Sequence, residues 1–252
     1  MARVSNIRVV LVETSHPGNI GAAARAMKTM GLSRLDLVAP REFPSEEARA
    51  RASGADDVLA DALVHGSLEE ALRGCGLVMG ASARTRSLPW PLIDAREAGV
   101  KAAVESDATE VALVFGRERS GLANDELARC HYLVNIPTNP DFYSLNVASA
   151  VQVLAYEVMM ASETGVEGGT ARDKRDPPAT AEEMEGFYAH LERVMIATGF
   201  LDPAVPRQLM RRMRRLFGRA RTEQTEVNIL RGLLSAVETG RKDVRPPDSR
   251  KS

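Results

Sequence analysis

The stretch SHPGNIGAAARAMKTMG, residues 15–31, follows directly on the apolar run IRVVLVE of residues 7–13. The run predicts a buried strand, and the alanine-rich segment predicts a helix that ends before Gly31, a residue type common after helix C-termini. A strand that ends in a glycine-containing turn and continues as a helix leaves unpaired backbone N–H groups around a cleft. Such a cleft suits an anion, a ribose or a reacting group, although any strand-to-helix connection can have this appearance.

Short apolar runs alternate with amphipathic segments through the first 160 residues. The runs predict strands over Ile7–Glu13, Leu35–Ala39, Leu63–His65, Leu77–Gly80, Val111–Phe115 and Tyr132–Ile136. The amphipathic segments predict helices over Asn19–Met30, Leu68–Arg73, Asp125–Arg129 and Leu145–Ala161. This alternation indicates an α/β fold with a parallel sheet covered on both faces.

The sequence changes character after this block. Five glycines or prolines with no apolar period occur in residues 163–179, which indicates a linker, and helical patterns follow it. Thr180 with Glu183 is a capping-box pattern, and Asp202-Pro203 predicts the start of the next helix. We therefore expect an α/β domain over 1–162, a flexible linker over 163–179, a small all-helical domain over 180–240 and a disordered tail over 241–252.

Composition bounds the class of protein. The 252 residues carry a net charge of −1, with 44% hydrophobic and 27% charged residues, as in an ordinary globular chain. The two cysteines, Cys75 and Cys130, form no zinc-binding spacing and no disulfide framework, so we expect a reduced, cytoplasmic protein, and the sequence gives no evidence for a metal. No segment looks like a signal peptide or approaches transmembrane length.

Several common site types are disfavoured. The segment GRERSG has the spacing of a phosphate loop, but Leu122 stands where such a loop requires lysine. A dinucleotide-binding G-x-G-x-x-G and a hydrolase G-x-S-x-G are both missing. The four histidines, His16, His65, His131 and His190, are scattered, and we expect surface or capping roles for them.

Three segments in order carry a recognisable pattern: NIGAAARA at 19–26, LVFGRERSGL at 113–122, and IP with YSLNVASAV at 136–151. Together they resemble the three motifs of the SPOUT superfamily of RNA methyltransferases, and more narrowly its TrmH-type branch, which methylates ribose 2′-hydroxyls. The segment SARTRSLPWPL at 82–92 and the arginine-rich C-terminal helices extend the resemblance over nearly the whole chain.

The resemblance implies a SPOUT fold in which S-adenosyl-L-methionine binds within a C-terminal trefoil knot of the α/β domain. Composition and periodicity do not reveal a knot, because knots are almost absent from proteins. Carried over by motif, the cofactor contacts are Ala81, Ser82, Ala83, Gly116, Ile136, Tyr143, Ser144 and Leu145. Glycine at 116 makes physical sense where the backbone itself approaches a ligand.

The catalytic set implied by the resemblance is Asn19, Arg25, Glu118, Ser144 and Asn146. Family proposals make the arginine a proton acceptor, but a guanidinium is a poor base because its pKa lies above about 12. Our hypothesis is that Arg25 clamps a phosphate or the 2′-oxygen, with Asn19 and Glu118 orienting it. Ser144 and Asn146 would position the cofactor or the ribose.

Simpler interpretations exist for each of these residues. Asn19 and Ser144 can be helix caps, and Arg25 can be a solvated helix residue. Glu118 can belong to an ion-pair cluster with Arg117 and Arg119, an interpretation that stays as strong as the catalytic one. The recurrence of all three motifs in order favours the catalytic set.

A run of seven arginines without an acidic residue fills positions 207–221. Such a run is typical of phosphate binding, although charge runs are usually solvated faces. Predicted RNA contacts are Arg84, Arg86, Arg207, Arg211, Arg212, Arg214, Arg215 and Arg219, while Trp90 is expected to fill the core. TrmH-type enzymes act as homodimers, and the apolar helix after Ser144 can form the interface or pure core.

The sequence thus predicts a dimeric tRNA 2′-O-methyltransferase that acts on cytidine or uridine at position 32 of the anticodon loop. Two alternatives stay open at this point. One is the same reaction at another tRNA position or on rRNA, and the other is a catalytically silent RNA-binding module.

Overall fold

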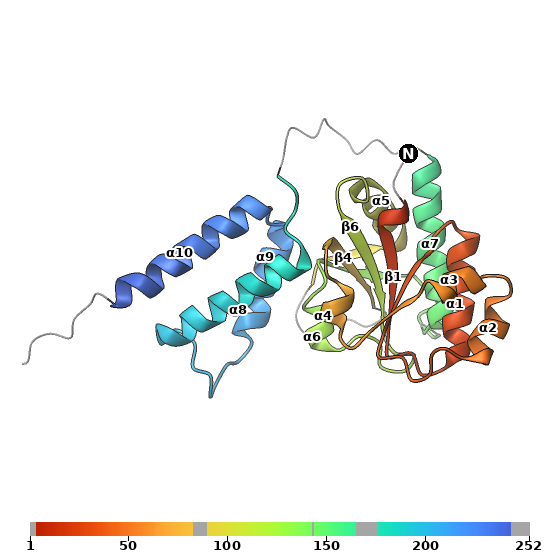
Figure 1. Cartoon of the computed structure of the whole chain (residues 1–252), viewed down its shortest axis with the longest axis horizontal. Helices are drawn as coiled ribbons and strands as arrows, with labels where there is room; N and C mark the ends of the chain where they lie inside the picture. Colours follow the sequence, from red (N-terminus) through yellow and green to blue (C-terminus); the bar gives the residue numbers. More distant parts are fainter. Residues whose placement is uncertain (1–3, 83–89, 143, 165–175, 243–252) are drawn as a thin grey trace, which may run out of the picture.

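The chain folds into an α/β part and a helical part (Figure 1). The structure, a computed structural model, describes residues 4–82, 90–142, 144–164 and 176–242. We call residues 4–164 the α/β part and residues 176–242 the helical part. None of the described helices combines the length and the hydropathy needed to cross a membrane.

The α/β part is built on a seven-stranded sheet of order β3-β2-β1-β6-β4-β7-β5, in which every neighbouring pair is parallel. The strands are β1 (Ile7–Val12), β2 (Arg34–Val38), β3 (Leu63–His65), β4 (Cys75–Ala81), β5 (Leu92–Asp94), β6 (Glu110–Phe115) and β7 (Tyr132–Asn135). The predicted parallel α/β fold is confirmed. Strand β5 was not predicted from the sequence.

Helices cover both faces of the sheet. One face carries α1 (Pro17–Thr29), α5 (Ala95–Glu105) and α7 (Val147–Glu163), with α2 (Glu46–Ala52) and α3 (Asp56–Ala60) packed outside α1. The short helices α4 (Leu68–Ala71) and α6 (Asn124–Leu127) lie on the other face. A single 3-10 turn, Val4–Asn6, precedes β1. The knot implied by the family resemblance stays a prediction.

Helix α1 begins two residues before the predicted start, because Pro17 occupies its first turn, where a missing N–H costs nothing. Its packing against α2 requires a glycine. A Cβ atom at Gly21 would lie 1.9 Å from the carbonyl oxygen of Ala48. The absence of a side chain at this position therefore lets the two helices approach closely.

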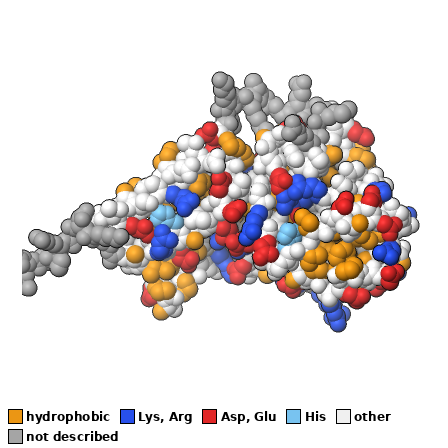
Figure 2. All heavy atoms as spheres, viewed as in Figure 1, with side chains coloured by type: hydrophobic (Ala, Val, Ile, Leu, Met, Phe, Trp, Pro, Cys, Tyr) orange, Lys and Arg blue, Asp and Glu red, His pale blue; other side chains and the backbone are white. Residues whose placement is uncertain are grey.

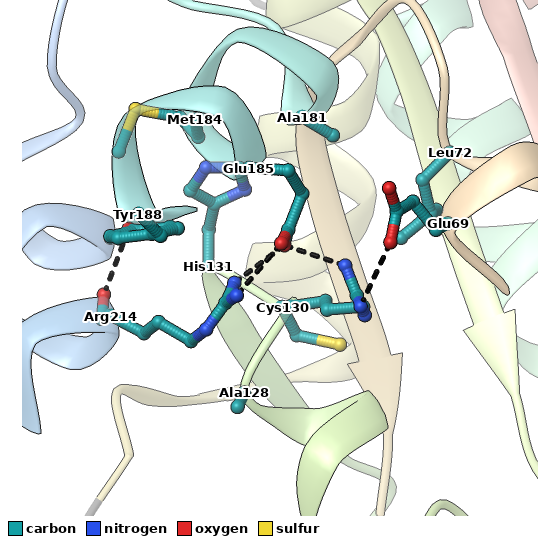
Figure 3. Close-up of a pocket in the computed structure, with 12 residues that line it drawn as sticks. Glu69, Leu72, Ala128, Cys130, His131, Ala181, Met184, Glu185, Tyr188 and Arg214 are labelled. Atoms are coloured by element: carbon teal, nitrogen blue, oxygen red, sulfur yellow. Dashed lines mark hydrogen bonds and ion pairs between the residues drawn. The ribbon is translucent and has the colours of Figure 1, made fainter. Parts of the chain in front are cut away.

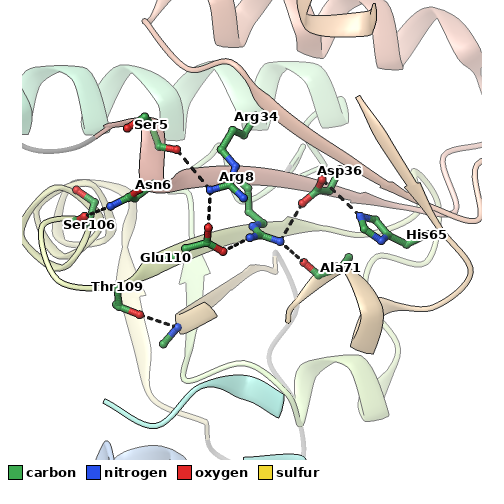
Figure 4. Close-up of polar contacts among 11 residues, drawn as sticks. Ser5, Asn6, Arg8, Arg34, Asp36, His65, Ala71, Ser106, Thr109 and Glu110 are labelled. Carbon is green, nitrogen blue, oxygen red and sulfur yellow. Dashed lines mark hydrogen bonds and ion pairs between the residues drawn. The ribbon is translucent and has the colours of Figure 1, made fainter. Parts of the chain in front are cut away.

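A buried cluster of charged side chains joins the central strands near their amino ends (Figure 4). Arg8 of β1 is 6% exposed, and it pairs with Asp36 of β2 at 3.3 Å and with Glu110 of β6. The Arg8 guanidinium also donates to the carbonyl of Ala71 at 2.9 Å. Arg34 of β2 reaches the same Glu110 at 2.7 Å. Because a buried guanidinium is costly without partners, these contacts stabilise β1 between β2 and β6.

The helical part contains α8 (Ala181–Ala197), α9 (Leu209–Ala220) and α10 (Gln224–Lys242). Its core includes Phe187 of α8 and Phe217 of α9, whose rings meet edge to face with centroids 4.8 Å apart. The predicted capping box is confirmed: the backbone N–H of Thr180 donates to Glu183 at 2.8 Å, and the Glu183 N–H donates to the Thr180 hydroxyl.

The prediction that Asp202-Pro203 starts a helix is wrong, because α9 begins only at Leu209. The Asp202 carboxylate accepts the N–H of Ala204 at 2.8 Å, so it closes a local turn. Arg207 then takes a left-handed conformation with φ of 49°, which interrupts any helix that would start earlier.

We expect Gly21→Ala to destabilise the α/β part, because the new methyl group would overlap the Ala48 carbonyl. Overpacking of this kind costs about 1–3 kcal/mol, which urea denaturation measures as a lower free energy of unfolding. Gly186→Ala in α8 is the matched control, since open space surrounds Gly186 and alanine favours a helix by up to about 1 kcal/mol. Unchanged stability of the Gly21 variant would contradict the close approach of α1 and α2.

Candidate functional site

The carboxyl ends of the central strands border a cavity of about 450 Å³. It lies at the carboxyl ends of β4, β6 and β7, the edge of an open parallel sheet at which ligands bind. The volume falls within the range of about 300–1,000 Å³ that is typical of small-molecule sites. Six of the eight residues predicted to bind the cofactor line it: Ala81, Ser82, Gly116, Ile136, Ser144 and Leu145. Ala83 and Tyr143 lie outside the described residues.

The loop after β6, residues 116–122, forms one wall of the cavity by folding back on itself. The N–H of Gly121 donates to the carbonyl of Arg117 at 2.9 Å. A Cβ atom at Gly116 would lie 2.2 Å from the carbonyl carbon of Gly121. Only glycine at position 116 permits the two ends of the loop to lie this close. Because Gly116 has no side chain, its backbone is accessible from the cavity.

Glu118 ties this loop to the turn between β1 and α1. Its carboxylate accepts the hydroxyl of Ser15 at 2.9 Å and the side-chain amide of Asn19 at 3.0 Å. It also accepts the backbone N–H groups of Ser15, at 3.2 Å, and of His16, at 3.3 Å. Burial raises the pKa of Glu118, but the hydrogen bonds from Asn19 and Ser15 outweigh it and lower that pKa to about 2. Glu118 is therefore a permanent carboxylate whose lone pairs are engaged.

Asn19 and Asn146 meet directly, although 127 positions separate them along the chain. The Asn146 amide donates to the Asn19 side-chain oxygen at 2.9 Å. The Asn146 side-chain oxygen in turn accepts the N–H of Ala148 and caps α7. A continuous chain of hydrogen bonds thus runs from Glu118 through Asn19 to the start of α7, where exposed Ser144 lies beside the cavity.

Arg25 stands apart from this chain of contacts. It follows Asn19 by six residues, which displaces it by about 9 Å along the helix axis and turns it to another face. Its side chain is exposed and makes no hydrogen bond or ion pair with the described residues. Within the described part of one chain, Asn19 and Glu118 contact each other and do not orient Arg25.

Arg117 and Ser15 were not singled out as site residues by sequence analysis. Arg117 does form ion pairs, but its partners are Glu13 and Glu126, whereas Glu118 is held by uncharged donors. The alternation of charge in the segment GRER signals an ion-pair cluster. This pattern does not identify the carboxylates that take part, because both partners of Arg117 lie outside the segment GRER.

The arginines of the basic run have different surroundings. Arg211 pairs with Asp125 of α6 at 2.8 Å, and Arg214 pairs with Glu185 of α8 at 2.5 Å (Figure 3). Glu185 also binds Arg129 at 2.6 Å, which links the helical part to the α/β part. Figure 2 shows acidic and basic side chains gathered between the two parts in this view. Arg215 is half-buried, while Arg207, Arg212 and Arg219 are exposed.

The seam between the two parts is tightly filled. The cavity there, whose lining residues Figure 3 draws, measures only about 30 Å³ and is too small for a substrate. Trp90 is partly buried, as expected, and its indole N–H donates to the carbonyl of Cys130 at 2.8 Å. Arg84 and Arg86 lie outside the described residues.

Two histidines contradict the expectation of surface or capping roles. His190 is 7% exposed. The ring of His131 accepts the N–H of Val78 at 3.0 Å, and burial together with nearby Arg221 lowers its pKa to about 3. His131 is thus a neutral structural residue at pH 7. No group of three His, Cys, Asp or Glu side chains among the described residues could hold a metal ion.

Comparisons with known proteins identify relatives of both parts of the chain. Residues 6–156 match the SpoU rRNA Methylase family, and residues 182–249 match the C-terminal domain of the tRNA methyltransferase TrmJ. A tRNA (cytidine/uridine-2′-O-)-methyltransferase TrmJ of Pectobacterium atrosepticum is 54% identical over 93% of this chain and 98% of its own. The crystal structure of TrmJ from Z. mobilis is 35% identical over 92% of this chain and 98% of its own, with a TM-score of 0.80. A probable methylase family protein from Haemophilus influenzae is 45% identical over 96% of this chain and 100% of its own, with a TM-score of 0.61.

Glu118→Gln removes the charge that the donors of Ser15, His16 and Asn19 share. Because the pKa of Glu118 falls from 4.5 to about 2 on folding, the carboxylate stabilises the fold above pH 4.5, and that contribution is lost as the pH falls toward 2. For this partly exposed group we expect about 1 kcal/mol at pH 7. Chemical denaturation of wild type and variant at pH 7 and pH 3 should show the stability difference shrink. A difference independent of pH would contradict the assignment.

Proposed function

This chain belongs to the SpoU rRNA methylase family, and from that premise we propose that it transfers a methyl group from S-adenosyl-L-methionine to a ribose 2′-hydroxyl of tRNA. The observation that carries the proposal is the cavity at the sheet edge, next to the Glu118–Asn19–Asn146 chain of hydrogen bonds. The similarity over nearly the whole chain to a tRNA (cytidine/uridine-2′-O-)-methyltransferase supports cytidine or uridine as the target.

The residues of the cavity fit a cofactor of this kind. Ala81, Ile136 and Leu145 offer apolar surface for an organic group, and the glycine at 116 lets the backbone approach it. S-adenosyl-L-methionine, when bound, supplies an electrophilic methyl group on a sulfonium. The protein must then place the acceptor hydroxyl in line and accept one proton, tasks that depend on positioning more than on an oxyanion hole.

Positioning falls to the side chains at the mouth of the cavity. We propose that Ser144 and Asn146 hold the cofactor or the ribose, with Asn146 fixed by its bond to Asn19. Glu118 is a weak candidate for the proton acceptor, because its low pKa and its four hydrogen bonds disfavour protonation. Its role is to hold the turn that carries Asn19.

Arg25 is proposed to bind the RNA phosphate or the 2′-oxygen, which would lower the pKa of the attacking hydroxyl. Its exposure and the lack of a carboxylate partner among the described residues support this role. A guanidinium suits it because the planar fork donates two parallel hydrogen bonds to an anion. The proton would leave through Arg25 or a water molecule.

We propose that the helical part binds the tRNA body while the α/β part binds and methylates the anticodon loop. Exposed arginines on α9 without acidic neighbours in the run support this division. We further propose a homodimer, position 32 of the anticodon loop as the target, and a cytoplasmic location, as expected for the TrmH-type branch.

Two alternatives remain distinct from this proposal. The family description names rRNA, so one alternative is the same methyl transfer to rRNA. A silent RNA-binding module is disfavoured, because Asn19, Ser144 and Asn146 are all present and the first and last of them are in contact.

We expect wild-type protein to place one 2′-O-methyl mark at position 32 when it is incubated with S-adenosyl-L-methionine and bulk tRNA from cells that lack it. Arg25→Ala should abolish that mark, because it removes the guanidinium that we propose binds the phosphate or the 2′-oxygen. Nucleoside mass spectrometry with position mapping measures both. A mark at another position would move the substrate and keep the reaction, whereas no mark on tRNA or rRNA would favour the silent module.

Arg212→Ala and Arg219→Ala should each weaken tRNA binding and reduce the slope of log affinity against log salt by about one. Both side chains are exposed, so their loss removes phosphate contacts without breaking the fold. Arg214→Ala is the contrasting variant, since its guanidinium pairs with Glu185 and stacks 4.4 Å from the centre of the Tyr188 ring. It should lower thermal stability more than it changes the salt slope. Unchanged slopes for Arg212 and Arg219 variants would count against α9 as the RNA-binding surface.

A further inference from the structure

Arg117, which lines the cavity, connects three segments of the α/β part. Its guanidinium donates to the Glu13 carboxylate, with the Nε contact at 2.8 Å, and to both oxygens of Glu126 at 3.0 Å. It also donates to the carbonyl of Gly121 at 3.4 Å, which closes its own loop. Glu13 follows β1, Arg117 follows β6 and Glu126 belongs to α6. One planar group with five donors thus serves two carboxylates and a carbonyl.

Arg117 and its neighbour Glu118 both bind the segment that joins β1 to α1, each at a different end of it. Arg117 binds Glu13 at the start of this turn, and Glu118 binds Ser15 and Asn19 at its end. Glu13 has φ of 47°, a left-handed conformation that is costly for a residue with a side chain. An ion pair that engages Glu13 in this conformation offsets part of that cost.

The same contacts set the distance between the two halves of the proposed active site. The loop of residues 116–122 lines the cofactor cavity, whereas Asn19 holds Asn146 at the ribose side. The Glu13–Arg117 pair bridges these halves at the base of the turn. Side chains of Arg117, Glu13 and Glu126 are 25%, 50% and 16% exposed, so solvent screens the pair with Glu126 less than the pair with Glu13.

We propose, resting on the proposed function, that Arg117 is a positioning residue for methyl transfer: through Glu13 and Glu126 it fixes the cofactor loop against the turn that carries Asn19. In this role it acts through its ion pairs, while its own residue is also one of those that line the cavity. Loss of its fork would let the loop and the turn move apart, and a displacement of about 1 Å can cost a methyltransferase up to about 100-fold in rate.

The test compares Arg117→Ala, Arg117→Lys and Glu13→Gln in the full-length protein, with Arg49→Ala as the matched control. Arg49 also forms ion pairs, with Glu46 and Asp56, but it lies 68% exposed on α2. The measurements are kcat and KM for tRNA methylation, the Kd for S-adenosylhomocysteine by calorimetry, and the thermal midpoint.

We expect Arg117→Ala to lower kcat about 10- to 100-fold, to weaken S-adenosylhomocysteine binding several-fold, and to leave KM for tRNA within twofold of wild type. Arg117→Lys should recover only part of kcat, because an ammonium cannot bind two carboxylates in a planar fork. Glu13→Gln should lower kcat in the wild-type background and add nothing further in the Arg117→Ala background.

A kcat for Arg117→Ala within twofold of wild type would overturn the inference, as would full additivity of the Glu13 and Arg117 substitutions. If Arg117→Ala fails to fold, Arg117→Lys and Glu13→Gln still test the inference, since each keeps a polar side chain of similar shape. Measurements on the wild-type protein distinguish failure of this inference from failure of the proposed function. If the wild-type protein neither methylates tRNA nor binds S-adenosylhomocysteine, the proposed function itself is refuted.

Discussion

The parallel pairing of β1 with β6 is the constraint on which the rest of the α/β part depends. These strands lie about a hundred residues apart in sequence, yet they sit side by side with Ile7 opposite Val111 and Leu11 opposite Phe115. Charged side chains secure both ends of the pair. Arg8 and Glu110 pair at the amino end, and the ion pair of Arg117 with Glu13 secures the carboxyl end. The ion pair of Arg117 therefore joins the loop that lines the cavity to the end of β1.

The internal ion pairs of α9 and the RNA binding proposed for it require the same arginine side chains. A run of arginines attracts phosphates, but Arg211 and Arg214 already have carboxylate partners, in Asp125 and Glu185. Arg129 shares Glu185 and so connects the helical part to the α/β part. Because internal ion pairs neutralise part of the run, its charge cannot be equated with RNA-binding strength, and the exposed arginines are the ones free to meet a phosphate.

Much of the fold and part of the site could be predicted from sequence. Short apolar runs identified six strands to within two residues at each end, because the strands of a parallel sheet are predominantly apolar. The motif turns led to Gly116, Ile136 and Leu145, which do line the cavity. The roles of Asn19 and Glu118 were harder to separate from helix capping and ion pairing, since their partners lie a hundred residues away and leave no local pattern.

The sequence by itself determined the strands, the helices with strong apolar periods and the order of the motif turns, because these depend on interactions between residues close along the chain. Only the tertiary structure decided which charges pair. It joined Arg117 to Glu13 and not to adjacent Glu118, and it separated Arg25 from the Asn19 that precedes it by one and a half turns of helix. Which charged side chains pair depends on the distance and direction between them in the folded protein. No rule about spacing along the chain predicts that distance and direction.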